Sequence, residues 1–265
     1  VANCLLGEDL GDDTLIIGTS GRYEFKNKGI DVFLESLNRL NRDKDLKKKV
    51  LAFVNVPGWV GDPREDLQKR LKSKNKFTEP LQCPFITHWL HNMTHDQVLD
   101  MLKYLGMGNR PEDKVKVIFV PCYQDGHDGI LNKHYYDLIL GEDLSVYPSY
   151  YEPWGYTPLE SVAFRVPTIT TDLAGFGLWV NSLKNQHGID DGVEVLHRSD
   201  YNYSEVADGI KDTVALFSTK TEAEIKEIRK RAGQVAEQAL WKHFIKYYYE
   251  AYDIALRNAM KRQLR

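Results

Sequence analysis

Two segments of this 265-residue chain carry charged side chains beside glycines and prolines, an arrangement that suits a binding site. The first segment, residues 21–29, reads GRYEFKNKG and contains Arg22 and Lys28. Arginine binds a phosphate group through two parallel hydrogen bonds, lysine binds it as a point charge, and glycine lets the backbone approach closely. A predicted helix follows, and the amino end of a helix favours anions, so this segment could bind phosphate. A solvated basic loop is the alternative.

The second segment, residues 148–160, reads PSYYEPWGYTPLE and places two carboxylates eight residues apart. Pro158 suits the first turn of a helix, and Thr157 suits the N-cap position before it. Glu152 would then lie on the loop and Glu160 in the helix, at different depths of one cleft. A turn that is stabilised by proline and aromatic residues, with exposed glutamates, is the alternative.

Short apolar runs alternate with segments of helical periodicity and supply the framework for these segments. Strands are predicted at residues 14–17, 50–56, 115–120, 144–147, 167–171 and 193–196, and helices near residues 30–40, 98–105, 135–140 and 159–164. This order predicts an α/β fold with a Rossmann-like parallel sheet flanked by helices. Ligands bind past the carboxyl ends of such strands, so we expect the site in the loops at residues 18–29, 121–130, 148–157 and 172–177.

A helical C-terminal tail is predicted after the last strand. Thr221 and Glu224 have the spacing of a capping box and precede a charged helix at residues 222–239. Aromatic residues then follow at helical spacing over residues 241–252, which is typical of a packing surface.

The domain organisation follows from these elements. Residues 58–84 are the least regular part of the chain and are interpreted as an excursion from the sheet. We therefore predict a sheet domain at residues 1–220, which includes this excursion, and C-terminal helices at residues 221–265.

The composition excludes several classes of protein. Hydrophobic residues make up 42% of the chain and charged residues 28%, with a net charge of −3, so we expect neither a nucleic acid nor an anionic membrane as a partner. No apolar run approaches the roughly 20 residues of a membrane span, and no signal peptide is recognised. The three cysteines offer no disulfide framework, which favours a reducing, cytoplasmic location. No G-x-G-x-x-G follows a strand, which counts against a nicotinamide dehydrogenase.

The segment EPWGYTP-x-E, residues 152–160, resembles the signature of the glycogen synthases of the animal and fungal type, glycosyltransferase family 3. Residues 21–29 are similar to that family's G-R-Y-E-F-x-N-K-G motif. Residues 113–121 and 170–177 also resemble family segments, in the same order along the chain. The resemblance implies a GT-B fold, in which two Rossmann-like domains face a cleft. It implies that this chain is the carboxyl-terminal, nucleotide-sugar-binding half, and that its last helices pack toward an amino-terminal domain.

The resemblance also implies roles for individual residues. Arg22 and Lys28 would hold the donor diphosphate, and Glu152 would contact the transferred glucose; these three form the expected catalytic set. Glu160 would bind the ribose hydroxyls, and Tyr135, seventeen residues before Glu152, would stack on uracil. The other expected substrate-binding positions are Gly21, Gly155, Tyr156 and Thr157.

The implied reaction is retaining transfer of glucose from UDP-glucose to the non-reducing end of an α-1,4-glucan such as glycogen. No metal ion and no further cofactor are expected, and the chain by itself is expected to be inactive. ADP-glucose stays open as the donor. The alternatives are another retaining glycosyltransferase and a non-catalytic module that binds sugar nucleotides.

The histidines do not have the spacing of a metal site. His88, His91 and His95 lack the i, i+4 pair with an intervening glutamate that zinc proteases use, so we expect ordinary polar histidines. The loop at residues 125–128 holds two aspartates and a histidine after a strand. A solvated loop is expected there, with ligand contact as the alternative.

Overall fold

The computed structural model describes residues 1–73, 75–184 and 186–263. Its centre is a six-stranded sheet in the order β5-β2-β1-β6-β7-β8, with every neighbouring pair parallel. The strands are β1 (Leu15–Ser20), β2 (Val50–Asn55), β5 (Val115–Val120), β6 (Leu144–Val146), β7 (Thr168–Thr171) and β8 (Val193–Leu196). The predicted Rossmann-like parallel sheet is therefore confirmed.

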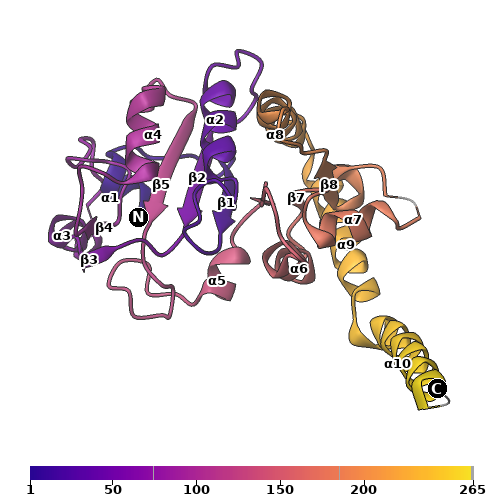
Figure 1. Cartoon of the computed structure of the whole chain (residues 1–265). Helices are drawn as coiled ribbons and strands as arrows, with labels where there is room; N and C mark the ends of the chain where they lie inside the picture. Colours follow the sequence, from indigo (N-terminus) through magenta and orange to yellow (C-terminus); the bar gives the residue numbers. More distant parts are fainter. Residues whose placement is uncertain (74, 185, 264–265) are drawn as a thin grey trace.

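Helices cover both faces of the sheet (Figure 1). One face carries α2 (Ile30–Asn41), α4 (Gln97–Leu105) and α8 (Tyr203–Phe217). The opposite face carries α1 (Ala2–Leu6) and α3 (Glu65–Lys72) near β2 and β5, and α6 (Tyr156–Ala163), α7 (Gly175–Asn181) and α9 (Glu222–Gln238) near β7 and β8. A short helix, α5 (Tyr135–Ile139), precedes β6, and a 3-10 turn, Ile189–Asp191, precedes β8. Buried strands need apolar residues on both sides, which is why the strand predictions from short apolar runs succeeded.

Strand β1 is longer than predicted. Gly18 and the following residues were assigned to a loop, but the strand continues to Ser20. A Cβ atom at Gly18 would overlap the carboxyl group of Glu142, so this glycine makes room for that side chain and does not mark a turn. Burial raises the pKa of Glu142 to about 8, and Ser145 Oγ donates a hydrogen bond of 2.6 Å to this carboxyl.

The irregular excursion is larger than the predicted residues 58–84. It contains α3 and a two-stranded antiparallel sheet of β3 (Val60–Pro63) and β4 (His88–Leu90). The guanidinium of Arg64 is fully buried and donates hydrogen bonds to the carbonyls of Gln82, Cys83 and Ile86. This arginine therefore ties the backbone of the excursion together, beside the apolar cluster that includes Leu67, Leu71 and Leu81.

The two final helices differ in their packing. Helix α9 begins with the predicted capping box at Thr221 and buries Ile228, Ala232 and Val235. Helix α10 (Trp241–Gln263) extends away from the sheet, and most of its side chains are exposed (Figure 1). In the described ranges, no helix is both long and apolar enough to cross a lipid bilayer.

Candidate active site

The strand order creates a crevice between β1 and β6. The connections from β1 lead toward β2 and β5, whereas those from β6 lead toward β7 and β8. The loops that follow β1 and β6 therefore diverge at this point, and open α/β sheets bind their ligands in such a crevice. These loops are residues 21–29, the first charged segment, and residues 147–155, which contain the loop part of the second charged segment.

The two loops pack directly against each other. Gly29, the N-cap of α2, has a φ of 67°, and a Cβ atom there would overlap the carbonyl oxygen of Pro148. The backbone N–H of Tyr150 donates a hydrogen bond of 2.7 Å to the carbonyl of Asn27. Position 29 needs a glycine because of its positive φ and because of the close approach of the Pro148 carbonyl. This close approach sets the distance between the two loops.

Lys28 and Glu152 form an ion pair across the crevice, although 124 residues separate them in the sequence. Their side chains are only 15% and 20% exposed. The alkyl stem of Lys28 lies beside Gly21, 4.0 Å from the position that a Cβ atom would take there. Two of the expected catalytic residues and Gly21 are therefore together.

The backbone of Glu152 is fixed by the segment that follows β7. Its N–H donates to the carbonyl of Leu173 at 3.3 Å, and its carbonyl accepts from the N–H of Gly175 at 3.0 Å. A Cβ atom at Gly175 would overlap the carbonyl of Pro153. Residues 172–177 were predicted as a loop, but Gly175 already begins α7, and this close approach explains its glycine.

Arg22 does not reach this ion pair. Its guanidinium is 74% exposed and pairs with Glu24 at 3.0 Å. The backbone beside it is held, because the Tyr23 hydroxyl donates to the Asp96 carboxylate at 2.7 Å and accepts from the N–H of Val98 at 3.0 Å. The loop is thus anchored to the start of α4, while the Arg22 side chain lies exposed beside Glu24.

Helix α6 starts earlier than predicted. We expected Thr157 as the N-cap, but the helix begins at Tyr156 and the N-cap is Gly155, whose φ is 107°. Only glycine adopts this backbone conformation readily, so the helix begins two residues before the sequence pattern suggested. Thr157 lies in the first turn, and Tyr156 is largely exposed. The first-turn N–H groups, which have no partners within a helix, lie at the carboxyl edge of the sheet because α6 follows β6.

A match with a protein-family model identifies the family of this chain. The family model for glycogen synthase matches residues 6–79 and 62–265, which together cover most of the chain. The chain belongs to the glycogen synthase family.

Individual relatives agree with this assignment to the glycogen synthases. The glycogen [starch] synthase of Neurospora crassa is 29% identical over 94% of this chain, and isoform 2 from Saccharomyces cerevisiae is 29% identical over 96%. The chain spans only 42% and 44% of these two relatives. Among solved structures, the pneumococcal O-GlcNAc transferase in complex with UDP and GlcNAc matches 91% of this chain and 36% of its own, with a TM-score of 0.50 and 13% identity. This likeness concerns the fold, which is that of one half of a GT-B glycosyltransferase.

A network of hydroxyl groups that the sequence did not reveal lies beneath the crevice in this glycogen synthase domain. Ser20 Oγ lies 2.7 Å from the Tyr135 hydroxyl and 3.3 Å from the Tyr147 hydroxyl, which lies 2.8 Å from Ser161 Oγ. Burial raises the pKa of Tyr147 to about 12, so this phenol stays protonated near neutral pH. The network orients the ring of Tyr135, the expected uracil platform. Its members come from three elements and the loop after β6, so no local spacing indicates it.

Glu160 lies on α6 and contacts α5. Its Oε1 accepts a hydrogen bond of 3.1 Å from the Tyr136 hydroxyl. Burial raises the pKa of Glu160, and the hydrogen bond from Tyr136 opposes that rise. Tyr136 is the neighbour of the predicted Tyr135 and was not identified from the sequence.

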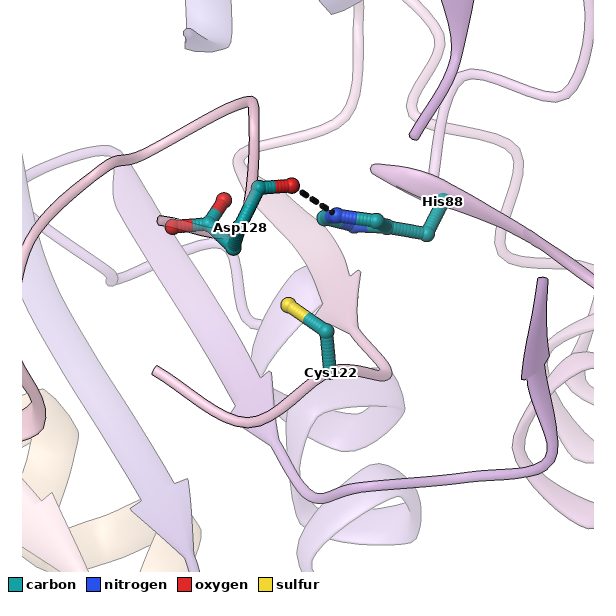
Figure 2. Close-up of side chains that lie close together, drawn as sticks. All are labelled: His88, Cys122 and Asp128. Carbon is teal, nitrogen blue, oxygen red and sulfur yellow. Dashed lines mark hydrogen bonds between the residues drawn. The ribbon is translucent and has the colours of Figure 1, made fainter. Parts of the chain in front are cut away.

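His88 is grouped with Cys122 and Asp128 rather than with His91 and His95 (Figure 2). The possible ligand atoms of these three residues lie within 4.8 Å of one another. Two of the three groups have another role: His88 Nε2 donates a hydrogen bond of 2.7 Å to the backbone carbonyl of Asp128, and the Asp128 carboxylate accepts hydrogen bonds from the N–H groups of residues 130–132. Burial raises the pKa of the Cys122 thiol to about 12, so this thiol is protonated near neutral pH. The arrangement favours a hydrogen-bonded anchor for the loop after β5.

Proposed function

We propose that this chain is the donor-binding half of a retaining glucosyltransferase, which moves glucose from UDP-glucose to the non-reducing end of an α-1,4-glucan such as glycogen. The observation that carries the proposal is the Lys28–Glu152 ion pair at the crevice between β1 and β6. A cation and a carboxylate at that place match the two ends of a sugar diphosphate. ADP-glucose is the alternative donor.

Donor binding would exchange partners within this ion pair. Lys28 would turn from Glu152 to the diphosphate, and the exposed Arg22 would leave Glu24 to reach the same oxygens. Glu152 would then accept hydrogen bonds from the glucose hydroxyls. Fixed cations, together with the N–H groups at the start of α6, stabilise the negative charge that develops on the departing diphosphate.

The chemical step breaks the bond between the anomeric carbon of glucose and the diphosphate oxygen, and forms a bond to the acceptor 4-hydroxyl oxygen on the same face. The acceptor proton passes to the departing phosphate, so atoms and charge balance. Glu152 orients the sugar and stabilises an oxocarbenium-like transition state, and it is not a covalent nucleophile.

The nucleoside would lie along α5 and α6. Glu160 would accept hydrogen bonds from the ribose hydroxyls, and the ring of Tyr135 would stack on uracil. Thr157 and the backbone of Tyr156 would donate to the diphosphate, while Gly21 and Gly155 would let the backbone approach it.

An amino-terminal domain would complete the cleft and supply the acceptor contacts. The chain spans less than half the length of its fungal relatives, and α10 leaves an exposed aromatic surface against which such a domain could pack. We call this chain joined to that domain the two-domain protein, and we expect the chain without it to transfer no glucose.

We expect the two-domain protein to transfer glucose without a metal ion, because the positive charges that stabilise the leaving group are side chains. Incorporation of radiolabelled glucose from UDP-glucose into glycogen should be unchanged after treatment with EDTA. Loss of transfer after EDTA, with recovery on addition of Mg²⁺ or Mn²⁺, would contradict the proposed mechanism. No transfer to glycogen, but transfer to a different sugar acceptor, would instead support the alternative glycosyltransferase.

Donor binding should weaken in acid because of Glu160. Ribose hydroxyls donate to the ionised carboxylate, and burial raises its pKa, so affinity should fall at a higher pH than for a free glutamate. UDP-glucose is the suitable probe, because its two phosphates have no ionisation in this range. Calorimetric titration from pH 7.5 down to pH 4.5 should show this fall in UDP-glucose affinity in the wild type. In Glu160→Gln, the affinity should not change over this pH range. Identical profiles for both proteins would exclude Glu160 from donor binding.

A further inference from the structure

Tyr136 is an exposed aromatic residue whose hydroxyl is committed to a carboxylate. Its side chain is 47% exposed, and its hydroxyl donates to Glu160 Oε1 at 3.1 Å. The charge of Glu160 raises the pKa of Tyr136, so the phenol remains a hydrogen-bond donor through the neutral range.

The position of this hydroxyl is fixed by the rings around it. The Tyr136 ring lies 5.4 Å from the ring of Tyr135 and 5.3 Å from the ring of Phe164, measured between centroids. Tyr135 is itself tied to Ser20 through its hydroxyl. A partly exposed aromatic side chain is thus held between two neighbours, and its oxygen is set before any ligand arrives.

We propose that Tyr136 is a positioning residue for ribose recognition: it holds one oxygen of Glu160 so that the other oxygen faces the two ribose hydroxyls of a ribonucleoside diphosphate. This inference rests on the proposed role of Glu160 and adds the residue that sets its geometry.

Two features favour positioning over obstruction. The Tyr136 hydroxyl contacts Oε1, and the structure gives Oε2 no hydrogen-bond partner among the described residues, so a second acceptor remains available. A half-buried glutamate such as Glu160 loses side-chain entropy when a ligand fixes it. Tyr136 removes part of that loss in advance, so its hydroxyl should strengthen the binding of a ribose and have no effect on a sugar that lacks both hydroxyls.

The test compares UDP with 2′,3′-dideoxy-UDP by calorimetric titration of the full chain. Tyr136→Phe keeps the ring and removes the hydroxyl, and we expect it to weaken UDP binding about three- to tenfold while leaving dideoxy-UDP unchanged. Tyr104→Phe is the matched control, because Tyr104 on α4 is 87% exposed and lies outside the crevice. In a Glu160→Ala background, Tyr136→Phe should cause no further loss of UDP affinity.

The outcomes separate the two proposals. Equal loss for both nucleotides would mean that Tyr136 acts through general packing, and tighter UDP binding would mean that it obstructs the ribose; either result overturns the inference while leaving the proposed function intact. Failure of the wild type to bind either UDP or ADP would overturn both.

Discussion

Glu152→Gln is expected to lower the rate of glucosyl transfer in the two-domain protein by about 10²–10³-fold, with UDP affinity equal to or higher than that of the wild type. The amide keeps the shape of the side chain but removes the negative charge that stabilises the oxocarbenium-like transition state. It also releases Lys28 from its ion pair, so that the diphosphate no longer competes with Glu152. Initial rates with saturating UDP-glucose and a separate titration of UDP measure the two effects.

Glu205→Gln is the control for this substitution, since Glu205 is an exposed glutamate on α8. A Glu152→Gln protein that transfers glucose at more than a tenth of the wild-type rate would remove Glu152 from the catalytic set. A protein that loses UDP affinity and rate together would show that the carboxylate serves nucleotide binding instead.

Lys28→Met should lower UDP affinity about 10–100-fold, whereas Glu152→Gln should keep or raise it. The rate of glucosyl transfer should fall correspondingly in Lys28→Met. Methionine retains most of the apolar stem beside Gly21 but cannot bind the diphosphate. Lys26→Met is the matched control, because Lys26 lies in the same loop and is exposed. Equal UDP affinities for the Lys26 and Lys28 variants would contradict the assignment.

Folding must be separated from binding in this experiment. Removal of one member of a largely buried ion pair leaves an uncompensated charge, so Lys28→Met should lower the melting temperature. The double variant Lys28→Met/Glu152→Gln should recover stability, because neither side chain is charged. It should not recover UDP affinity or transfer, whereas a purely structural pair would regain both with the fold.

The sheet was predictable from the sequence because buried parallel strands are continuous apolar runs. The run VKVIFV predicted β5 to the residue. The pattern failed where a glycine served packing instead of a turn: Gly18 lies within β1 under Glu142, and Gly175 begins α7 against Pro153. A glycine that accommodates a neighbour looks the same in sequence as one that ends a strand.

The candidate site was predictable only as far as its residues form local motifs. The two loops could be identified, and the parallel topology implied that they would meet. Partners from other elements could not be found in this way: Tyr136 contacts Glu160 from a different helix, and His88 contacts Asp128 across forty residues. The exposure of Arg22 and its pairing with Glu24 also depend on side-chain conformation, which residue spacing does not determine.

A crystal structure of this chain with UDP bound is the most direct test of the central claim, that one nucleotide occupies the crevice between β1 and β6. The account predicts diphosphate oxygens within hydrogen-bonding distance of Lys28 and Arg22, with the Lys28–Glu152 contact opened and the ribose hydroxyls on Glu160. A nucleotide bound at the amino-terminal edge of the sheet, with the Lys28–Glu152 pair intact, would contradict it.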